Sequence, residues 1–331
     1  MGNSERLEGE ASIIAEFFAP LTDGDPGAAG LVDDCAVLTL APATDLVVTT
    51  DSLVEGVHFL PGDIPSFKAL AVNVSDLIAK GATPERYLLN LALPEPPTRA
   101  FMTRLAEGLA EAQQTFGCHL IGGDTDRTPG PFTLTITAIG SLPAGSVVRR
   151  TTARPGDIIA VTGTIGDAGL GLALRKDPKR ARQAGLSADY AAFLISRFEK
   201  PVPRLAAAAL VRDFATAAMD VSDGLAKDLA RMASASGTGA NIQIEKVPLS
   251  DGARIMCSQG FVRREDLIAS GEDYEVLFTL STDRWPAFQS VASTTGVPVT
   301  ALGTMTQDDG VSWRDSYGGA MPLTTGGWDH F

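Results

Sequence analysis

The sequence predicts an α/β (α+β) protein with two domains. The chain has 331 residues, which is enough for about two domains that each bury a core. Segments with strand character alternate with segments with helix character along the chain. Hydrophobic residues make up 44% of the sequence and charged residues 20%, a balance that is ordinary for a globular protein.

The first half of the chain is expected to combine strands with two helices. The helix at 66–80 follows Pro65 and ends at Gly81, and the helix at 101–116 places apolar residues along one face. The segment FTLTITA alternates apolar residues with threonine, which is typical of a half-buried strand. The predicted strands of this half are 46–50, 119–121 and 132–138.

The second half begins after residues 142–155, which combine proline and glycine with a cluster of arginines. Such a stretch is typical of a connection, so we place the boundary there and predict domains 1–148 and 149–331. Helices are expected from about Asp167 and at 225–235. The predicted strands are 158–161, 241–247, 274–280 and 297–302.

Charge and composition exclude several classes of protein. The net charge of −13 argues against nucleic acid or an anionic membrane as a partner. Three distant cysteines make neither a disulfide framework nor a zinc cluster. The first residues lack a basic region followed by an apolar run, and the longest uncharged stretch, 128–148, is rich in turn formers. We therefore expect a cytoplasmic protein without a signal peptide or membrane span.

Aspartates recur where the predicted strands and helices meet loops. Any one of them can cap a turn or a helix. Together they indicate a site, because carboxylates brought close together repel one another unless a cation neutralises them. Oxygen ligands with few cysteines and histidines select Mg²⁺, which also bridges phosphates. The recurring aspartates are Asp33, Asp34, Asp51, Asp76, Asp124, Asp220 and Asp223.

Such a cluster suits phosphoryl transfer, because catalysis of that reaction consists of positioning and neutralisation of charge on oxygens. The sequence has no G-x-x-x-x-G-K-[ST] loop and no protein-kinase signature. The glycine-containing run at 162–167 lacks a lysine, and it is predicted to be a tight turn between a strand and a helix.

Two further positions have a functional and a structural interpretation. His58 could contact a substrate, or it could be a satisfied structural histidine among apolar neighbours. Arg149 or Arg150 could clamp a phosphate, although paired arginines often form a solvated face.

The same alternatives apply near the end of the chain. Glu272 and Asp273 could recognise a cationic substrate, or they could be solvated acids of a turn before a strand. Trp328 could stack on a ring, or it could anchor the end of the chain in a groove.

A series of motifs resembles thiamine-monophosphate kinases, which belong to the superfamily of aminoimidazole ribonucleotide synthetase. The motifs occur in the family's order across nearly the whole chain. The related synthetases share the nucleotide-binding half of the pattern but not GVHF, GEDYE and the aromatic tail in combination. The motifs are DDCAVL, TTDSLVEGVHF, KALAVNVSDLIAKGA, LIGGDT, AVTGTIGDAGLGL, MDVSDGLAKDL, SGEDYEVLF and GGWDHF.

The resemblance implies a two-domain PurM-like fold. The N-terminal sheet would pair with the same sheet of a second subunit to form a barrel in a homodimer. The C-terminal half would form a second α/β domain. The strand at 132–138 is expected to lie in that sheet and to need covering by the second copy. The implied reaction is ATP-dependent phosphorylation of thiamine monophosphate to thiamine diphosphate, the last step of thiamine diphosphate biosynthesis. The transfer would be direct and in line, with several Mg²⁺ ions and no phosphoenzyme.

The resemblance also implies the roles of particular residues. The substrate contacts fall on His58, Glu272 and Trp328, and the ATP contacts fall on Gly123, Asp124, Arg150 and Ser222. No residue would act as a covalent nucleophile, and the metal-bound Asp51 and Asp124 are expected to be essential. The metal ligands fall on Asp34, Thr49, Thr50, Asp51, Asp76, Asp124, Asp220 and Asp223.

The sequence departs from the family pattern at Val32, where the family often has glycine; this costs backbone freedom in the first motif. Either Arg149 or Arg150 could align with the family's ATP-binding arginine.

Three rival interpretations remain. One is a synthetase of the same superfamily that activates an amide or thiocarboxamide oxygen with ATP. A selenophosphate synthase is disfavoured because no cysteine lies in a glycine-rich N-terminal loop. A non-catalytic metal-binding dimer need not keep His58, Glu272 and the aromatic tail together with every aspartate. ATP turnover that requires thiamine monophosphate would separate the kinase from all three.

Overall fold

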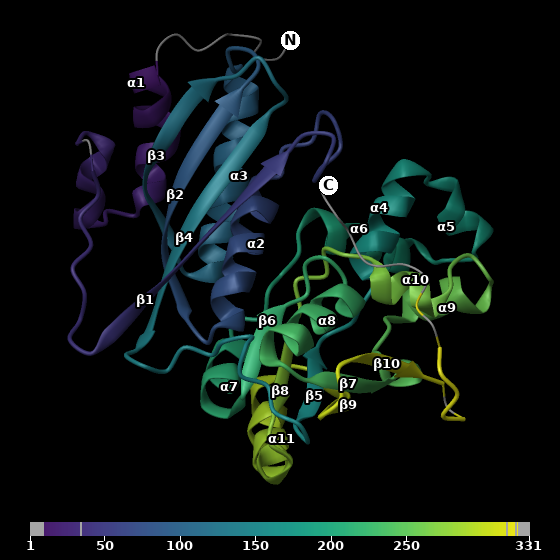
Figure 1. Ribbon diagram of the computed structural model, residues 1–331. Coiled ribbons are helices and arrows are strands. Elements are labelled where there is room, and N and C mark those ends of the chain that lie inside the picture. Colours follow the sequence, from purple (N-terminus) through teal and green to yellow (C-terminus); the bar gives the residue numbers. More distant parts are fainter. Residues whose placement is uncertain (1–9, 34, 316, 322, 324–331) are drawn as a thin grey trace. The chain divides into compact units, whose positions relative to one another are not determined.

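The computed structural model describes residues 10–33, 35–315, 317–321 and 323. The chain divides into two compact units (Figure 1). The first unit comprises Met1–Leu77 and Ala82–Gly145, and the second comprises Ile78–Gly81 and Ser146–Phe331. The division after Gly145 lies close to the boundary that the composition indicates.

The first unit is built on a four-stranded sheet with the order β1-β4-β2-β3. The parallel pair is β2 and β3, and the other neighbours are antiparallel. Two helices, α2 (Ser66–Ala79) and α3 (Arg99–Phe116), cover one face of this sheet (Figure 1). The strands are β1 (Thr44–Val54), β2 (Thr83–Leu93), β3 (His119–Arg127) and β4 (Thr133–Pro143).

The central strand β4 explains why the helices pack on that face. Leu134 and Ile136 are completely buried, whereas Thr135 and Thr137 alternate with them and stay half-buried on the opposite face. Because successive residues of a strand point to opposite faces, the apolar set of β4 lies under the helices. The helices contribute buried residues spaced three or four positions apart, among them Leu70, Val74, Leu77, Leu105 and Leu109.

The chain before β1 forms short helical turns that pack beside β3. They are α1 (Glu10–Ile13), the π-helix η1 (Ile14–Phe18), and the 3₁₀-helices η2 (Ala19–Thr22) and η3 (Pro26–Leu31). Asp25 anchors them to the sheet. Its carboxylate accepts a hydrogen bond from Gly27 N at 2.6 Å, from Arg86 Nε at 2.6 Å and from His119 Nε2 at 2.6 Å.

Replacement of Asp25 by Asn should destabilise the protein by an amount that depends on pH. The hydrogen bond from His119, with help from Arg86 and Gly27, lowers the pKa of Asp25 from 3.8 to about 2. A lowered folded-state pKa means that the stabilisation is present above about pH 4 and is lost as the pH falls toward 2. We expect the variant to lose roughly 1 kcal/mol at neutral pH, allowing for solvent screening at the two partly exposed partners.

Urea unfolding of both proteins between pH 7 and pH 3 measures this effect. Asp23→Asn is the matched control, because Asp23 is exposed and has a left-handed backbone (φ 49°) that asparagine tolerates. A deficit of Asp25→Asn that stays constant over this pH range would contradict the proposed role of the charge.

The second unit is built on a six-stranded mixed sheet with the order β10-β7-β9-β5-β8-β6. Its strands are β5 (Ile158–Thr162), β6 (Ala217–Asp220), β7 (Gly239–Gln243), β8 (Val276–Leu280), β9 (Val299–Thr306) and β10 (Gly310–Arg314). Its helices are α4 (Asp167–Lys176), α5 (Lys179–Gln183), α6 (Ala188–Glu199), α7 (Ala207–Phe214), α8 (Leu225–Ser236), α9 (Asp251–Ser258), α10 (Arg264–Ala269) and α11 (Trp285–Thr295), with 3₁₀ turns η4 (Ile244–Lys246) and η5 (Thr282–Arg284).

Strand β8 is buried on both faces of this sheet. Leu277 belongs to one apolar cluster with Leu225 and Leu229 of α8. Its neighbour Phe278 points the other way and contacts Phe288 of α11, with 5.4 Å between ring centroids. Two-sided burial explains why β8 is a continuous apolar run and not an alternating one.

The structure confirms the predicted helices at 66–80, 101–116, 167 onward and 225–235, with ends that differ by at most a few residues. The strand predictions were less complete. Strand β2 was missed because the segment TPERYLLNLAL has proline at its second position, and the residues after that proline form a leucine-rich run without β-branched residues. Strands β6 and β10 are only four and five residues long and were also missed.

Several strand ends were predicted wrongly: β4, β7 and β9 end at Pro143, Gln243 and Thr306. Two further errors concern the site. Strand β1 continues past Asp51 to Val54, and β3 continues through Gly122, Gly123 and Asp124 to Arg127. Their polar residues suggested loops, but the backbone keeps pairing with β4 and β2 along these segments. The predicted need to cover the strand at 132–138 is corrected too: β4 is paired on both sides, and the sheet edges are β1 and β3.

Cys35 is an exposed free thiol, Cys118 is buried and Cys257 is half-buried. Residues 128–148 form β4 and its flanking turns and loops. Within the described part of the chain, no helix combines the length and the apolar character needed to cross a membrane.

Candidate active site

Some of the predicted metal ligands of the first unit gather on the helix-covered face of its sheet. Asp51 lies directly opposite Ile136 in the ladder, and Thr49 lies opposite Ala138. Paired residues of neighbouring strands point to the same face, so both side chains lie on the face that carries the buried residues of β4. Helix α2 contributes Asp76 there, and Thr49 Oγ1 donates a hydrogen bond to Asp76 Oδ2 at 2.6 Å.

The other predicted ligands of this unit lie on the opposite face, which the N-terminal turns partly cover. Thr50 Oγ1 donates to the Ile136 carbonyl at 3.1 Å and accepts from Thr137 Oγ1 at 3.0 Å. Asp124 is exposed on β3, in one row of the ladder with Asn90 of β2 and Thr135 of β4. Its Oδ1 accepts a hydrogen bond from the Thr125 N–H at 2.9 Å.

The two aspartates predicted to be essential therefore lie on different strands and different faces. Asp51 is on β1 and Asp124 is on β3, the two edges of the sheet. Three strand spacings separate these edges, which is roughly 14 Å. One ion cannot contact both carboxylates within a single sheet, since oxygen–Mg²⁺ distances are about 2.1 Å. Consistently, no three Asp, Glu, His or Cys side chains among the described residues form a group able to hold a metal ion.

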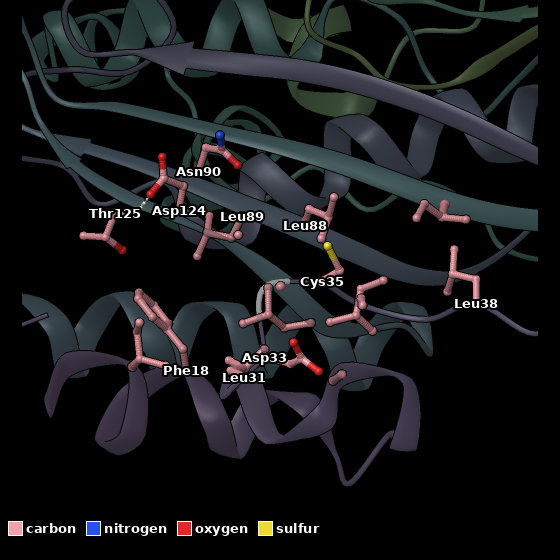
Figure 2. Close-up of a pocket in the computed structure, with 18 residues that line it drawn as sticks. Phe18, Leu31, Asp33, Cys35, Leu38, Leu88, Leu89, Asn90, Asp124 and Thr125 are labelled. Atoms are coloured by element: carbon pink, nitrogen blue, oxygen red, sulfur yellow. Dashed lines mark hydrogen bonds between the residues drawn. The ribbon is translucent and has the colours of Figure 1, made fainter. Parts of the chain in front are cut away.

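A pocket of about 640 Å³ adjoins Asp124. Figure 2 shows that Asp124, Asn90 and Thr125 form a polar end, whereas Phe18, Leu31, Leu38 and Leu88 form apolar walls between the N-terminal turns and the sheet. Asp33 and Cys35 of the first motif also line it. This combination of apolar walls and a few polar groups is typical of a small-molecule site.

Gly123 is required by the close approach of β3 to β2 beside this pocket. A Cβ atom at Gly123 would lie 1.9 Å from the carbonyl oxygen of Leu89. A larger residue would therefore push β3 away and displace Asp124.

His58 lies in a turn that follows β1. Its Nδ1 accepts a hydrogen bond from the Val54 N–H at 3.0 Å, and its carbonyl accepts from Lys68 Nζ at 3.0 Å. Because Nδ1 is an acceptor, the proton of the neutral ring lies on Nε2. His58 Nδ1 therefore holds the turn after β1 in place through its hydrogen bond with Val54. The Nε2–H group is the part of the ring that can donate to a ligand.

In the second unit, the motif MDVSDG forms a loop between β6 and α8. Asp220 is buried at the end of β6, and Ser222 and Asp223 follow it half-buried. The loop is shaped by Asp228 of α8, whose Oδ2 accepts hydrogen bonds from the N–H groups of Ser222 and Asp223 at 3.0 Å each. Burial raises the pKa of Asp228 to about 6.

The sequence argument did not single out Asp228. The available signal was an aspartate inside a helical stripe of apolar residues, where a carboxylate needs internal donors.

Basic side chains surround Asp223. Its carboxylate forms ion pairs with Arg231 and, at 3.6 Å, with Lys227. Arg150, Lys227 and Arg231 line an open depression of about 470 Å³. In a chain with a net charge of −13, this depression is a local positive site that suits a phosphate.

Glu272 lies in a turn that is hydrogen-bonded to the MDVSDG loop. The Glu272 N–H donates to the Ser222 carbonyl at 2.7 Å, and the Tyr274 N–H donates to the Val221 carbonyl at 2.9 Å. The predicted acceptor contact and the predicted ATP contact Ser222 are thus brought together. The alternative that Asp273 is a solvated acid of this turn is wrong, because Asp273 is completely buried.

Two predicted residues, Asp34 and Trp328, lie outside the described residues. The remaining predicted metal ligands supply carboxylate and hydroxyl oxygens in both units, and none of them is a cysteine. Such oxygens fit a hard cation such as Mg²⁺, and the Thr49–Asp76 pair shows a hydroxyl and a carboxylate already side by side.

Comparisons with known proteins agree on one superfamily. Residues 32–142 match the family model described as AIR synthase related protein, N-terminal domain. Residues 154–315 match AIR synthase related protein, C-terminal domain. The two matches together cover most of the chain.

Curated relatives narrow this to one enzyme family. The chain is 39% identical to the thiamine-monophosphate kinase of Caulobacter vibrioides over 92% of this chain and 86% of that protein. It is also 39% identical to that of Salmonella typhimurium over 98% of both.

Among solved structures, AaThiL complexed with AMPPCP and TMP has a TM-score of 0.75 and 32% identity, covering 88% of this chain and 89% of that one. The chain therefore belongs to the thiamine-monophosphate kinases, phosphotransferases of the AIR synthase-related superfamily.

Proposed function

We propose that this chain transfers the γ-phosphate of ATP directly, and in line, onto the phosphate of thiamine monophosphate, giving thiamine diphosphate. The observation that carries the proposal is the set of carboxylates and hydroxyls at the family's metal positions, together with Glu272 on a loop bonded to Ser222. The acceptor is a phosphate oxygen that is already ionised, so no strong general base and no covalent nucleophile are needed.

Mg²⁺ bound at these positions would neutralise the phosphate oxygens and the charge that develops on them during transfer. Thr49, Asp51 and Asp76 would hold ions on one face of the first sheet, and Thr50 and Asp124 would hold ions on the other. Because the sheet separates Asp51 from Asp124, the two carboxylates would hold different ions. In the second unit, Asp220 and Asp223 would supply the remaining carboxylates.

We propose Gly123 and Asp124 as the ATP contacts of the first unit, and the basic depression of the second unit as a phosphate site. The pocket that ends at Asp124 has the size of an ordinary ligand site. Between the two candidate arginines we choose Arg150, because it lines the depression with Lys227 and Arg231. A planar guanidinium there can bind two phosphate oxygens at once.

Three kinds of contact with the acceptor are proposed at the family's positions. Glu272 would offset the positive charge of the thiazolium ring, Trp328 would stack on a ring, and His58 would donate from Nε2 to an oxygen of the acceptor. The structure that contains AMPPCP and TMP supports a site that holds both ligands together in this family.

A product assay tests the proposal directly. Purified protein with ATP, Mg²⁺ and thiamine monophosphate should form thiamine diphosphate and ADP in equal amounts. ATP consumption that does not depend on thiamine monophosphate would favour a synthetase of the same superfamily instead.

Removal of divalent metal should abolish tight ATP binding. The acidic site repels a polyanion unless cations stand between the carboxylates and the phosphates. Calorimetric titration with ATP should show clear binding in excess Mg²⁺ and little or none in excess chelator. Tight ATP binding without divalent metal would refute the proposed bridging.

The protein should also be a homodimer. Strand β1 has 11 residues and is an edge of the first sheet; among the described residues no strand pairs with its outer side, and Val48 on it is 59% exposed. Long exposed edge strands are normally covered, and a barrel closed by a second copy would cover both β1 and β3. These edges carry Asp51 and Asp124, so the interface would adjoin the metal sites.

Light scattering should give a mass near twice the chain mass of 34.6 kDa. A stable, active monomer at micromolar concentration would rule out the proposed barrel.

A further inference from the structure

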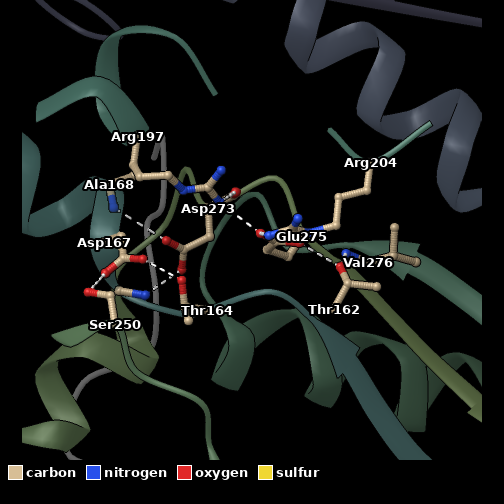
Figure 3. Close-up of polar contacts among 11 residues, drawn as sticks. Thr162, Thr164, Asp167, Ala168, Arg197, Arg204, Ser250, Asp273, Glu275 and Val276 are labelled. Carbon is tan, nitrogen blue, oxygen red and sulfur yellow. Dashed lines mark hydrogen bonds and ion pairs between the residues drawn. The ribbon is translucent and has the colours of Figure 1, made fainter. Parts of the chain in front are cut away.

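The N-terminus of helix α4 is occupied by a carboxylate from a distant part of the chain. This helix follows the glycine-containing run at 162–167, and its first residue is preceded by Gly166, which has no side chain to cap it. Asp273 takes that role. Its Oδ2 accepts from the Gly166 N–H at 2.7 Å, and its Oδ1 accepts from the Ala168 N–H at 3.4 Å (Figure 3).

The position that would hold a phosphate in a phosphate-binding loop is thus filled by the protein itself.

A second set of contacts holds the same turn from the other side. Arg197 of α6 donates from Nη2 to the Asp273 carbonyl at 2.8 Å and to Glu275 Oε1 at 3.0 Å. Glu275 also accepts from Arg204 Nε at 2.9 Å, from Arg204 Nη2 at 3.1 Å and from Thr162 Oγ1 at 2.6 Å. Asp273 and Glu275 are both buried, and Figure 3 shows that they point in different directions from one short segment.

These contacts hold the backbone in an unusual conformation around Glu272. Glu272 and Tyr274 have positive φ angles of 73° and 50°, in the left-handed region that residues other than glycine rarely adopt. Such conformations persist only where the surroundings determine them strongly, and they are often found at ligand sites. Asp273, the residue between the two, is the one whose side chain and carbonyl are both held.

The turn is also pressed against the MDVSDG loop. A Cβ atom at Gly271 would lie 2.5 Å from the Ser222 carbonyl oxygen, and one at Gly224 would lie 2.7 Å from the Ala269 carbonyl oxygen. The two loops therefore touch backbone to backbone. A small displacement of either loop would change the position of Glu272 relative to Ser222.

We propose that Asp273 and Arg197 are positioning residues that fix Glu272 for recognition of the acceptor. The inference rests on the proposed function, because Glu272 is the acceptor contact assumed there. It adds two residues that do not touch the substrate but hold the conformation of the residue that does.

The alternative explanation, that this network of buried charges only stabilises the fold, has less support. Buried ionic groups are costly to desolvate, and well-packed apolar residues often give equal or greater stability. At the opposite end of the same sheet, the turn before β5 carries only one comparable carboxylate, Asp157, which accepts from Arg154 N at 2.9 Å and from Thr216 Oγ1 at 2.6 Å. The denser network lies at the end that carries Glu272.

The test compares Asp273→Asn with Asp157→Asn. In Asp273→Asn the side-chain oxygen would still accept the hydrogen bond from the Gly166 N–H. The NH₂ group would face the Ala168 N–H, so that second hydrogen bond would be lost although the side chain keeps its size. Asp157→Asn is the matched control, since it alters another buried carboxylate at the far end of β5. Melting temperatures of the two variants show whether they are equally destabilised.

The expected result is a KM for thiamine monophosphate that rises about tenfold in Asp273→Asn, as for loss of a supporting contact. The KM for ATP should change less than about twofold, because Asp228 holds Ser222 and Asp223 independently. Arg197→Met should raise the KM for thiamine monophosphate as Asp273→Asn does. In Arg197→Lys the KM should rise less, because the lysine ammonium can still donate to the Asp273 carbonyl. Asp157→Asn should leave both KM values near those of the wild type.

Hydrogen exchange gives a measurement that does not depend on activity. In Asp273→Asn the N–H groups of Glu272 and Tyr274, which bond to the MDVSDG loop, should exchange faster than in the wild type and in Asp157→Asn. Unchanged exchange, or KM values for both substrates that rise together, would overturn the positioning role. A wild-type protein that forms no thiamine diphosphate would overturn the proposed function instead, and the exchange result would still decide whether Asp273 holds the turn.

Discussion

Asp51→Asn and Asp124→Asn should each lower kcat for thiamine diphosphate formation by at least about 100-fold. Each substitution keeps the size of the side chain and removes one negative charge from a proposed metal position. Loss of one electrostatic stabiliser at a site of developing charge commonly costs about 10²- to 10³-fold in rate. The two variants probe different places, because Asp51 lies at β1 on the face covered by α2 and α3, and Asp124 lies at β3 on the opposite face.

The measurement is the steady-state rate of product formation at saturating ATP, Mg²⁺ and thiamine monophosphate. Asp45→Asn and Asp126→Asn are matched controls. Both are exposed carboxylates on the same two strands, β1 and β3, and neither is a proposed ligand. The controls should retain near-normal kcat, which would separate loss of a ligand from a general change in charge.

Near-normal kcat in both Asp51→Asn and Asp124→Asn would show that these aspartates only shape their strands. A loss in one variant alone would restrict the essential metal position to one face of the sheet.

The fold was predictable where local pattern and tertiary packing agree. Helices 66–80 and 101–116 carry apolar stripes that the sheet of the first unit then buries, so their periodicity was a sufficient signal. The strands were harder. Polar residues along β1 and β3 hide the strand signal at Asp51 and Asp124, and only the pairing with β4 and β2 keeps these segments extended.

The sequence proposes candidate site residues, but it could not predict how they are arranged. That Asp51 and Asp124 lie on opposite faces follows from the ladder register, which is fixed by contacts between distant segments. Asp228 and Asp273 act through backbone N–H groups brought close by folding. In the sequence, Asp273 and Glu272 are simply neighbouring acids before a strand, and nothing local indicates that one is buried and the other is not.

Glu272→Gln and Trp328→Ala should each raise the KM for thiamine monophosphate by about 3- to 30-fold while leaving the KM for ATP nearly unchanged. Thiamine monophosphate carries a cationic thiazolium ring, and contact of an aromatic face with a cation is worth roughly 0.5–2 kcal/mol, depending on desolvation. Glu272→Gln removes the compensating charge and keeps the shape of the side chain. Trp328 lies outside the described residues, so its assignment rests on the family motif at the end of the chain.

The two KM values and the melting temperature, measured for each variant, separate substrate recognition from a structural role. Glu245→Gln is the control for charge, because Glu245 is an exposed carboxylate of the same unit at η4. If Glu272 only shapes its turn and Trp328 only anchors the chain end, the melting temperature should fall and both KM values should drift together. An unchanged KM for thiamine monophosphate in both variants would remove these residues from the acceptor site. Recognition of the thiazolium would then have to come from other carboxylates. The proposal that Asp273 positions Glu272 for acceptor recognition would lose its basis.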